Sequence, residues 1–288
     1  MSSSPVRTVV IGGGPAGVTA ALHAAELGAD VTLLERGHVG GTSLNQGPAP
    51  VRTLARAARL MRDWSSWETF GLRGPKPEVD LAATLANAQR VARYAHEHKR
   101  MSEHIRAMGV GLVEHAGNVR FVDPNTLAAE DGQVWAADRV IIAAGGRASR
   151  PAIPGADLAL TYEDIRTLAA LPDRVCVIGA ADTGCQLTSI LADFGCSVWL
   201  LEYAPRILPR ADQDVSTELE HAFRARGILA VTGARVTQLE PRGHGLGVVY
   251  QIGDQTRTVD VDAVLFAAGS AYLLLGSEEE TEAKRPST

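Results

Sequence analysis

The chain has 288 residues, of which 45% are hydrophobic, and a formal net charge of −5. This length suffices for two domains, and the two signs of charge are interspersed, which gives no basic surface for nucleic acid or an anionic membrane. The apolar runs are too short to span a bilayer, and the N-terminus lacks the apolar core of a signal peptide. We therefore expect a soluble, cytoplasmic protein with no nucleic-acid partner and no membrane partner.

Cysteine and histidine usage predicts neither disulfides nor a metal site. The chain has three cysteines and no CxxC pair, so buried structural thiols are expected. Three histidines cluster at His96, His98 and His104. Residues two apart do not share a helix face, and no cysteine or acidic pair completes a ligand set.

Residues 8–35 carry the pattern on which the rest of the interpretation depends. It consists of a strand (8–11), a turn with Gly12, Gly14 and Gly17, a helix (16–27), a second strand (31–34) and Glu35. This is the order of a nucleotide-binding βαβ unit with GxGxxG spacing. A glycine turn without a ligand would share the glycines, but not the acid at this distance.

Each glycine of this turn has a distinct physical role. Gly12 permits the tight turn out of the strand, Gly14 lets the backbone approach a pyrophosphate, and Gly17 lets the helix and strand pack closely. The phosphates would lie at the helix N-terminus, where unpaired N–H groups and the helix dipole favour an anion. Glu35 would accept a hydrogen bond from a ribose hydroxyl, so the stretch predicts a dinucleotide site.

The segment after Glu35 reads RGHVGGTSLNQGPAPVRTLARAARLMRDW, with helical apolar spacing from Val51 to Trp64. It resembles the redox loop and helix of the pyridine nucleotide-disulfide oxidoreductases, flavoproteins that include dihydrolipoamide dehydrogenase and mercuric reductase. In that family the loop reads GGTCxNxGCxPSK, with two cysteines over the flavin. Here Ser43 and Pro48 occupy the cysteine positions. Neither residue can form a disulfide, so no catalytic residue is predicted.

The remainder of the first half predicts a long helix from about Asp80 to Met108, followed by short strands. The expected strands cover residues 110–113, 120–122, 127–130, 133–136 and 139–144. A β-meander inserted before the strand that ends at Gly145 resembles the family's flavin domain. The resemblance places Gly117 near the adenine and Gly145 close to the cofactor, although both also fit plain turn glycines.

Beyond a proline-punctuated connection at residues 151–156, residues 174–202 repeat the opening pattern. Gly179, Ala181 and Gly184 take the three glycine positions. The methyl group of Ala181 limits the approach of a phosphate slightly, which some dinucleotide folds tolerate.

Glu202 takes the position of the acid in this second unit and bears on the choice of cofactor. A carboxylate there accepts a ribose hydroxyl and repels a 2′-phosphate, so NAD(H) is preferred to NADP(H). Arg206 would weaken that preference. By resemblance, Val236 and the turn at Gly269 touch the nicotinamide nucleotide.

The resemblance covers about residues 6–269 and implies an α/β fold of two Rossmann-like domains with a three-layer ββα architecture and an inserted β-meander. We assign residues 1–150 to an incomplete FAD-binding domain, 151–272 to an NAD(P)-binding domain and 273–288 to a disordered tail. Relatives continue with a segment that returns to the flavin and an interface domain that supplies the dimer surface. Because those parts have no counterpart in this sequence, the family's homodimer is not expected.

Two sets of residues are expected to bind the cofactors. The FAD set is Gly12, Gly14, Pro15, Ala16, Gly17, Glu35, Arg36, Gly41, Thr42, Arg52, Gly117 and Gly145. The NAD(H) set is Gly179, Ala181, Gly184, Glu202, Val236 and Gly269.

Further departures from the family concern charge. The family's Lys–Glu pair beside the flavin becomes Arg52 and Gln186, which leaves a cation without its anionic partner. Such a cation would stabilise an anionic reduced flavin and raise its potential, unless both residues simply lie on helix surfaces. Asp182 replaces the aromatic residue that covers the flavin in many relatives.

These observations favour an FAD-dependent oxidoreductase that accepts hydride from NAD(P)H and passes electrons to a non-disulfide acceptor, either a small molecule or a protein. Hydride transfer between apposed cofactors needs no protein acid or base. The alternative is a non-catalytic or remnant nucleotide-binding protein of the same fold. A thiol reductase would need cysteines that the site lacks.

Overall fold

The structure is a computed structural model that describes residues 4–45 and 47–272, without the side chains of residues 95–99 and 270–272. The chain forms two compact units. One comprises the described parts of Met1–Pro50, Arg90–Arg147 and Ala271–Thr288, and the other comprises Val51–Gln89 and Ala148–Ser270.

The first unit is built on a parallel sheet with the strand order β3-β2-β1-β7. Its elements are β1 (Arg7–Ile11), α1 (Pro15–Glu26), β2 (Asp30–Leu34), α2 (Gly41–Asn45), α5 (Met101–Ala107), β3 (Gly111–Val113), β4 (Val119–Asp123), β5 (Thr126–Ala129), β6 (Val134–Ala136) and β7 (Arg139–Ile142). Strands β4, β5 and β6 form a separate antiparallel sheet.

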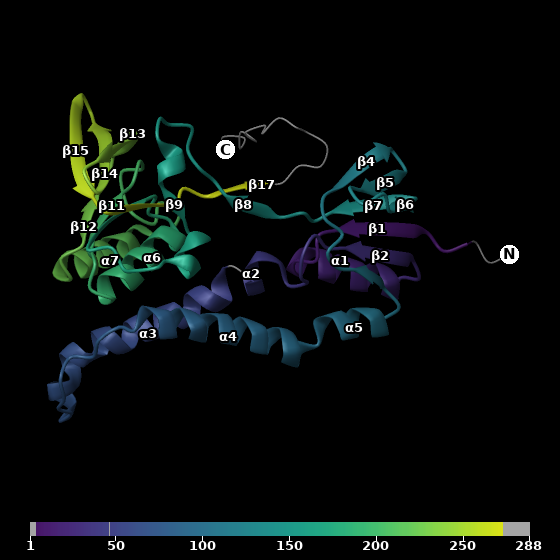
Figure 1. The fold of residues 1–288 in the computed structure, drawn as a ribbon, viewed down its shortest axis with the longest axis horizontal. Coiled ribbons are helices and arrows are strands. Elements are labelled where there is room, and N and C mark those ends of the chain that lie inside the picture. The colour runs from purple at the N-terminus through teal and green to yellow at the C-terminus, as the bar shows by residue number, and fades with distance from the viewer. Residues whose placement is uncertain (1–3, 46, 273–288) are drawn as a thin grey trace. The chain divides into compact units, whose positions relative to one another are not determined.

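Both faces of this parallel sheet are covered, which explains its nearly continuous apolar strands. On one face Val9 and Ile11 pack with Leu127 of the antiparallel sheet. On the other face Val10 packs with Ala21 of α1 and with buried residues of α5 and β2. The unit therefore has the expected ββα layers, with the meander as its outer sheet (Figure 1).

The second unit repeats this architecture around a parallel sheet with the order β12-β11-β10-β16-β9. Its elements are β9 (Leu160–Thr161), β10 (Arg174–Ile178), α6 (Asp182–Asp193), β11 (Ser197–Leu201), α7 (Gln213–Ala225), β12 (Leu229–Val231), β13 (Arg235–Arg242), β14 (Gly245–Ile252), β15 (Gln255–Val261) and β16 (Ala263–Phe266), with the short 3₁₀ helices η2 (Ala156–Leu158) and η3 (Asp164–Thr167). Strands β13, β14 and β15 cover one face and α6 and α7 the other (Figure 1). A two-stranded pair, β8 (Gly146–Ala148) and β17 (Ser270–Tyr272), completes the described chain.

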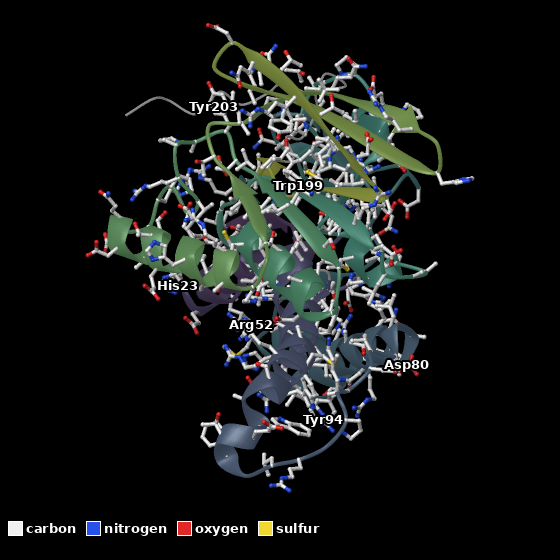
Figure 2. The ribbon with its side chains drawn as sticks, turned by 90° about the vertical axis from the view of Figure 1, so that its left-hand side faces the viewer. His23, Arg52, Asp80, Tyr94, Trp199 and Tyr203 are labelled. Carbon is white, nitrogen blue, oxygen red and sulfur yellow. The ribbon has the colours of Figure 1, made fainter. Side chains whose placement is uncertain are left out.

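The core of the second unit includes two further helices, α3 (Pro48–Asp63) and α4 (Leu81–Lys99), joined through the 3₁₀ helix η1 (Trp64–Phe70). Val51, Leu54 and Leu85 share a core cluster with Val177 of β10 and Leu187 of α6. Figure 2 shows these two helices, with Arg52 on α3 and Asp80 at the start of α4. Residues 51–89, which the sequence placed in the first domain, thus pack with the second sheet because their apolar faces complete its helical layer.

The single helix expected from Asp80 to Met108 is wrong, because the structure breaks it into α4 and α5. The Asp80 side chain accepts a hydrogen bond from the Ala83 N–H at 2.9 Å, which caps the start of α4. Arg100 then adopts a left-handed conformation with φ +43°. An α-helix cannot continue through a residue in this conformation, so a new helix begins at Met101.

The internal duplication extends to one equivalent ion pair in each parallel sheet. Arg7 binds Asp138 through two side-chain hydrogen bonds, the shorter at 2.7 Å, and its backbone N–H also donates to this carboxylate. Arg174 holds Asp262 in the same way, again with a shortest distance of 2.7 Å. In each unit the bonds join the start of the strand that leads into the glycine turn, β1 or β10, to the residue that precedes β7 or β16. Hydrogen bonds from arginine lower the pKa of Asp138 to about 2 and also lower the pKa of Asp262.

Because the pKa values of Asp138 and Asp262 are lowered in the folded chain, we expect both carboxylates to contribute to the free energy of unfolding in a way that acid removes. Because the folded-state pKa is lowered, the contribution is complete above the unfolded-state pKa of about 4 and disappears as the pH falls toward 2. The Asp138→Asn variant should have a lower Tm than the native chain at pH 7, and the difference should vanish near pH 2. Thermal unfolding followed by circular dichroism at both pH values measures this, with Glu78→Gln, at an exposed position, as the matched control. A Tm difference that is the same at both pH values would contradict the assignment.

Candidate functional site

The turn after β1 has a backbone that only glycine can form. Gly12 has φ +103°, and a Cβ atom there would lie 2.2 Å from the carbonyl oxygen of Ala143. A Cβ at Gly17 would lie 1.8 Å from the carbonyl oxygen of Gly12. The turn is therefore pressed between helix α1 and the segment after β7, as the roles of the first and third glycines require.

Gly14 differs from the other two glycines because the space beside it is open. The nearest heavy atom to a Cβ there is the Cα of Gly41, at 3.8 Å. Gly14 is also the N-cap of α1, and within the described residues no side chain caps this helix. Pro15, the first helical residue, has no N–H, but the following N–H groups of the first turn have no intrahelical partner. The helix therefore begins at an open position that suits an anion.

Glu35, at the end of β2, is held by the turn itself. Its Oε2 atom accepts the N–H of Gly13 at 2.6 Å, and its Oε1 atom accepts the N–H of Gly37 at 2.7 Å. A carboxylate oxygen can accept more than one hydrogen bond, so both oxygens retain the capacity to bind a hydroxyl. The sequence spacing predicted an acid here, but it did not predict that backbone N–H groups orient it.

The other expected FAD residues of the first unit lie around the same turn. Gly41 has φ +56°, and a Cβ there would lie 2.7 Å from the Cα of Gly14, so the start of α2 packs directly on the glycine turn. Gly117 (φ +67°) follows Ala116, whose N–H donates to the carbonyl of Glu35 at 2.9 Å. Gly145 (φ +73°) follows the residues that contact Gly12. Pro15 and Ala16 start α1, Thr42 is half-buried in α2, and Arg36 is exposed.

The second unit reproduces this geometry. Gly179 has φ +100°, and a Cβ there would lie 2.7 Å from the carbonyl oxygen of Ala267. A Cβ at Gly184 would lie 1.8 Å from the carbonyl oxygen of Gly179. Ala181 is the N-cap of α6 with φ −75°, close to the φ of −73° at Gly14, so this backbone accepts an alanine without strain.

Glu202 is locked in the same way as Glu35. Its Oε2 atom accepts the N–H of Ala180 at 2.5 Å, and its Oε1 atom accepts the N–H of Ala204 at 2.8 Å. The side chain of Arg206 donates to the carbonyl of Pro209 at 3.0 Å, an interaction within the loop that follows. Both acids are therefore positioned at the ends of their strands by equivalent backbone donors.

The two helix N-termini differ in charge. The first turn of α1 contains no acidic residue, whereas α6 begins with Asp182, which is exposed. No side chain caps α6 in the part of the chain that the structure describes. A carboxylate in the first turn complements the helix dipole, but it repels an anionic ligand at the same position. The N-terminus of α6 is therefore less favourable for an anion than that of α1.

Val236 and Gly269, the other two residues expected to contact the nicotinamide nucleotide, lie in different parts of the second unit. Gly269 has φ +105° and follows Ala267 and Ala268, which contact the first glycine of the turn. Val236, in β13, is half-buried and packs against the apolar core between the two sheets. The labelled Trp199 of β11 packs against the same core (Figure 2).

The two positions at which the resemblance expects redox cysteines are exposed. Ser43 lies in α2, and Pro48 is the first residue of α3, a position that proline favours. Arg52 on α3 and Gln186 on α6 are both exposed, and no direct bond between them is present among the described residues.

The cysteines of the chain lie elsewhere and are buried. All three are free, and burial raises the pKa of Cys185 to about 12, that of Cys196 to about 11, and that of Cys176 further still. They have the character of structural thiols. Among the described residues no group of three metal-ligating side chains is present, and the side chains of His96 and His98 lie outside those residues. Within the same part of the chain, no helix is long and apolar enough to cross a membrane.

Comparison with known proteins identifies the family. The family described as pyridine nucleotide-disulphide oxidoreductase matches residues 6–278. The chain belongs to this family. Its curated relatives include a dihydrolipoyl dehydrogenase of Zymomonas mobilis, 34% identical over 83% of this chain, and a mercuric reductase of Bacillus cereus, 31% identical over 91% of it. The chain spans 52% and 41% of the lengths of these two proteins.

Solved structures agree on the fold. LpdA from Mycobacterium tuberculosis matches 92% of this chain and 59% of its own with a TM-score of 0.77 at 25% identity. The HOCl-induced flavoprotein disulfide reductase RclA from Escherichia coli matches 92% of this chain and 56% of its own with a TM-score of 0.75 at 23% identity. Enzymes of the family use FAD and a pyridine nucleotide, as the resemblance of the sequence implied.

Proposed function

We propose that this chain provides the FAD- and NAD(H)-binding parts of an oxidoreductase that passes electrons to a non-disulfide acceptor. The observation that supports this most directly is the repeated site. Each unit has a glycine turn, a helix N-terminus that no described side chain caps, and a glutamate held by two backbone N–H groups. These features fit the pyrophosphate and ribose of a dinucleotide.

The chain's own residues would act by binding and orientation. The open space at Gly14 allows a pyrophosphate to approach the backbone of the first unit, and Glu35 would fix the adenosine ribose. In the second unit Ala181 and Glu202 would take these roles, and the negative charge of Glu202 disfavours NADPH. When bound, the flavin would supply the two-electron acceptor for NADH, and the protein would supply geometry.

The choice of a non-disulfide acceptor depends on Ser43 and Pro48. Neither side chain can form or cleave a disulfide, so a dithiol route is not open at these positions. A quinone needs no such relay, because it takes two electrons and two protons to become a hydroquinone. One of those protons comes from solvent, and the overall exchange is NADH, H⁺ and quinone giving NAD⁺ and hydroquinone.

A purified sample tests the proposal in two steps. The chain should take up added FAD with a visible flavin spectrum, and anaerobic NADH should bleach that spectrum. Benzoquinone should then restore the spectrum, whereas oxidised lipoamide should not. A protein that takes up no FAD, or whose bound flavin is not reduced by NADH, would indicate a non-catalytic nucleotide-binding protein instead.

A further inference from the structure

A groove of about 560 Å³ runs between α3, α6 and α7, all within the second unit. This volume lies within the range of about 300–1,000 Å³ that is usual for small-molecule sites. The lining includes Ala55, Ala58, Arg59, Arg62, Asp193 and Arg226. The glycine turn and Glu202 are not part of it, and Gln186, at the position that the resemblance places beside the flavin, is on its wall.

The floor of the groove is apolar and made of small or well-packed side chains. Ala58, Ile190 and Phe223 are buried in the core cluster of the unit, with Ala55 and Leu219 packed against it. On each helix the lining positions recur at intervals of three or four residues, so the groove follows one face of each helix. From Ala55 to Arg62 this face extends about 10 Å along the helix.

One end of the groove carries a cluster of charge. The Asp193 side chain is only 7% exposed and lies 2.7 Å from Arg226 and 3.5 Å from Arg62. Arg226 also donates to the hydroxyl and the carbonyl of Ser189, both at 3.0 Å. Burial raises the pKa of Asp193 and lowers that of Arg226, and each opposes the shift in the other. One carboxylate is therefore shared by two guanidinium groups.

The groove consequently has an excess of positive charge. Arg59 lies one helical turn before Arg62 on the same wall and is exposed. The structure shows no ion pair for Arg59 among the residues that it describes. Three arginines and one aspartate of the lining sum to +2 at neutral pH, and Asp63, whose charge also acts on Asp193, reduces the excess at this end to +1. A long apolar floor with two partly uncompensated guanidinium groups at its side complements a ligand that is itself apolar and anionic.

We propose that this groove binds an amphipathic organic carboxylate. Its apolar body would cover Ala55, Ala58 and Phe223, and its carboxylate would bind the guanidinium groups of Arg59 and Arg62. Arginine suits this role because its planar fork donates two parallel hydrogen bonds to a carboxylate. Arg226 holds Asp193 and shapes the end of the groove.

The test measures the binding of decanoate to the full chain by isothermal titration calorimetry. Decanoate should bind, and decanol, which has the same chain without the charge, should bind about tenfold more weakly. The double variant Arg59→Gln with Arg62→Gln should also bind decanoate about tenfold more weakly. Asp193 keeps Arg226 in this variant, so circular dichroism should show an unchanged fold. Arg73→Gln, at an exposed arginine outside the groove, is the matched control and should bind normally.

A second variant tests whether decanoate binds in the groove, without changing the charge of the groove. Ala222 is exposed on α7 and lines the groove, so Ala222→Trp should fill it and abolish decanoate binding while the fold remains intact. Absence of decanoate binding by the native chain would overturn the proposal. Equal binding of decanoate and decanol, or full binding by either groove variant, would overturn it as well.

Discussion

The Gly12→Ala variant is expected to lose FAD binding and to be less stable by about 3 kcal/mol or more. An alanine at φ +103° is strained by about 1–3 kcal/mol, and its Cβ would lie 2.2 Å from a backbone oxygen that cannot move without displacing the segment after β7. Thermal or urea unfolding measures the stability, and the visible spectrum after incubation with FAD measures binding.

Gly14→Ala is the matched control, because it adds the same methyl group to the same turn. Its φ of −73° suits alanine, and a Cβ there would meet no atom closer than 3.8 Å. Because alanine is a poorer N-cap than glycine, the stability of Gly14→Ala should fall by no more than about 1 kcal/mol, while FAD binding weakens because the methyl group lies in the path of the pyrophosphate. If both variants lost stability equally, steric crowding at Gly12 would not be the cause.

The sequence could predict the nucleotide units because their geometry depends on spacing within short segments. Gly12 and Gly179 both need a positive φ. Strands β2 and β11 are each followed by a glutamate that binds a backbone N–H group of the glycine turn. These constraints act over fewer than thirty residues and leave a readable pattern. The layers on the two sheet faces followed from the resemblance and are confirmed by the packing of the structure.

Interactions between distant segments could not be predicted in this way. Nothing in the apolar spacing of Leu54 or Leu85 specifies which sheet buries them, because a helix face suits either sheet equally. The break between α4 and α5 at Arg100 occurs without a glycine or proline, so the sequence does not indicate it. In the groove between α3, α6 and α7, the α3 residues are more than a hundred residues from the rest of the lining, so the groove becomes visible only in three dimensions.

The second large effect is expected at Glu202, where replacement by glutamine should weaken NADH binding by roughly tenfold to a hundredfold. Both carboxylate oxygens accept backbone N–H groups, at 2.5 and 2.8 Å. Glutamine presents an NH₂ group to one of these donors, which leaves an N–H without its acceptor at a cost of about 1–3 kcal/mol. Either the turn at Ala180, before α6, or the loop at Ala204, after β11, then loses the bond that orders it, and the ribose loses a charged acceptor.

Anaerobic titration of NADH fluorescence against protein saturated with FAD that has been reduced beforehand measures this effect, because reduced flavin does not oxidise NADH, and Glu35→Gln supplies the cross-control. Glu35 makes the equivalent bonds in the first unit, so its variant should weaken FAD binding and leave the affinity of the second unit for NADH unchanged. The Glu202→Gln variant should also discriminate less between NADH and NADPH, because the neutral amide no longer repels the 2′-phosphate. A loss of NADH affinity in the Glu35 variant equal to that in the Glu202 variant would mean that the two sites are not assigned to different cofactors.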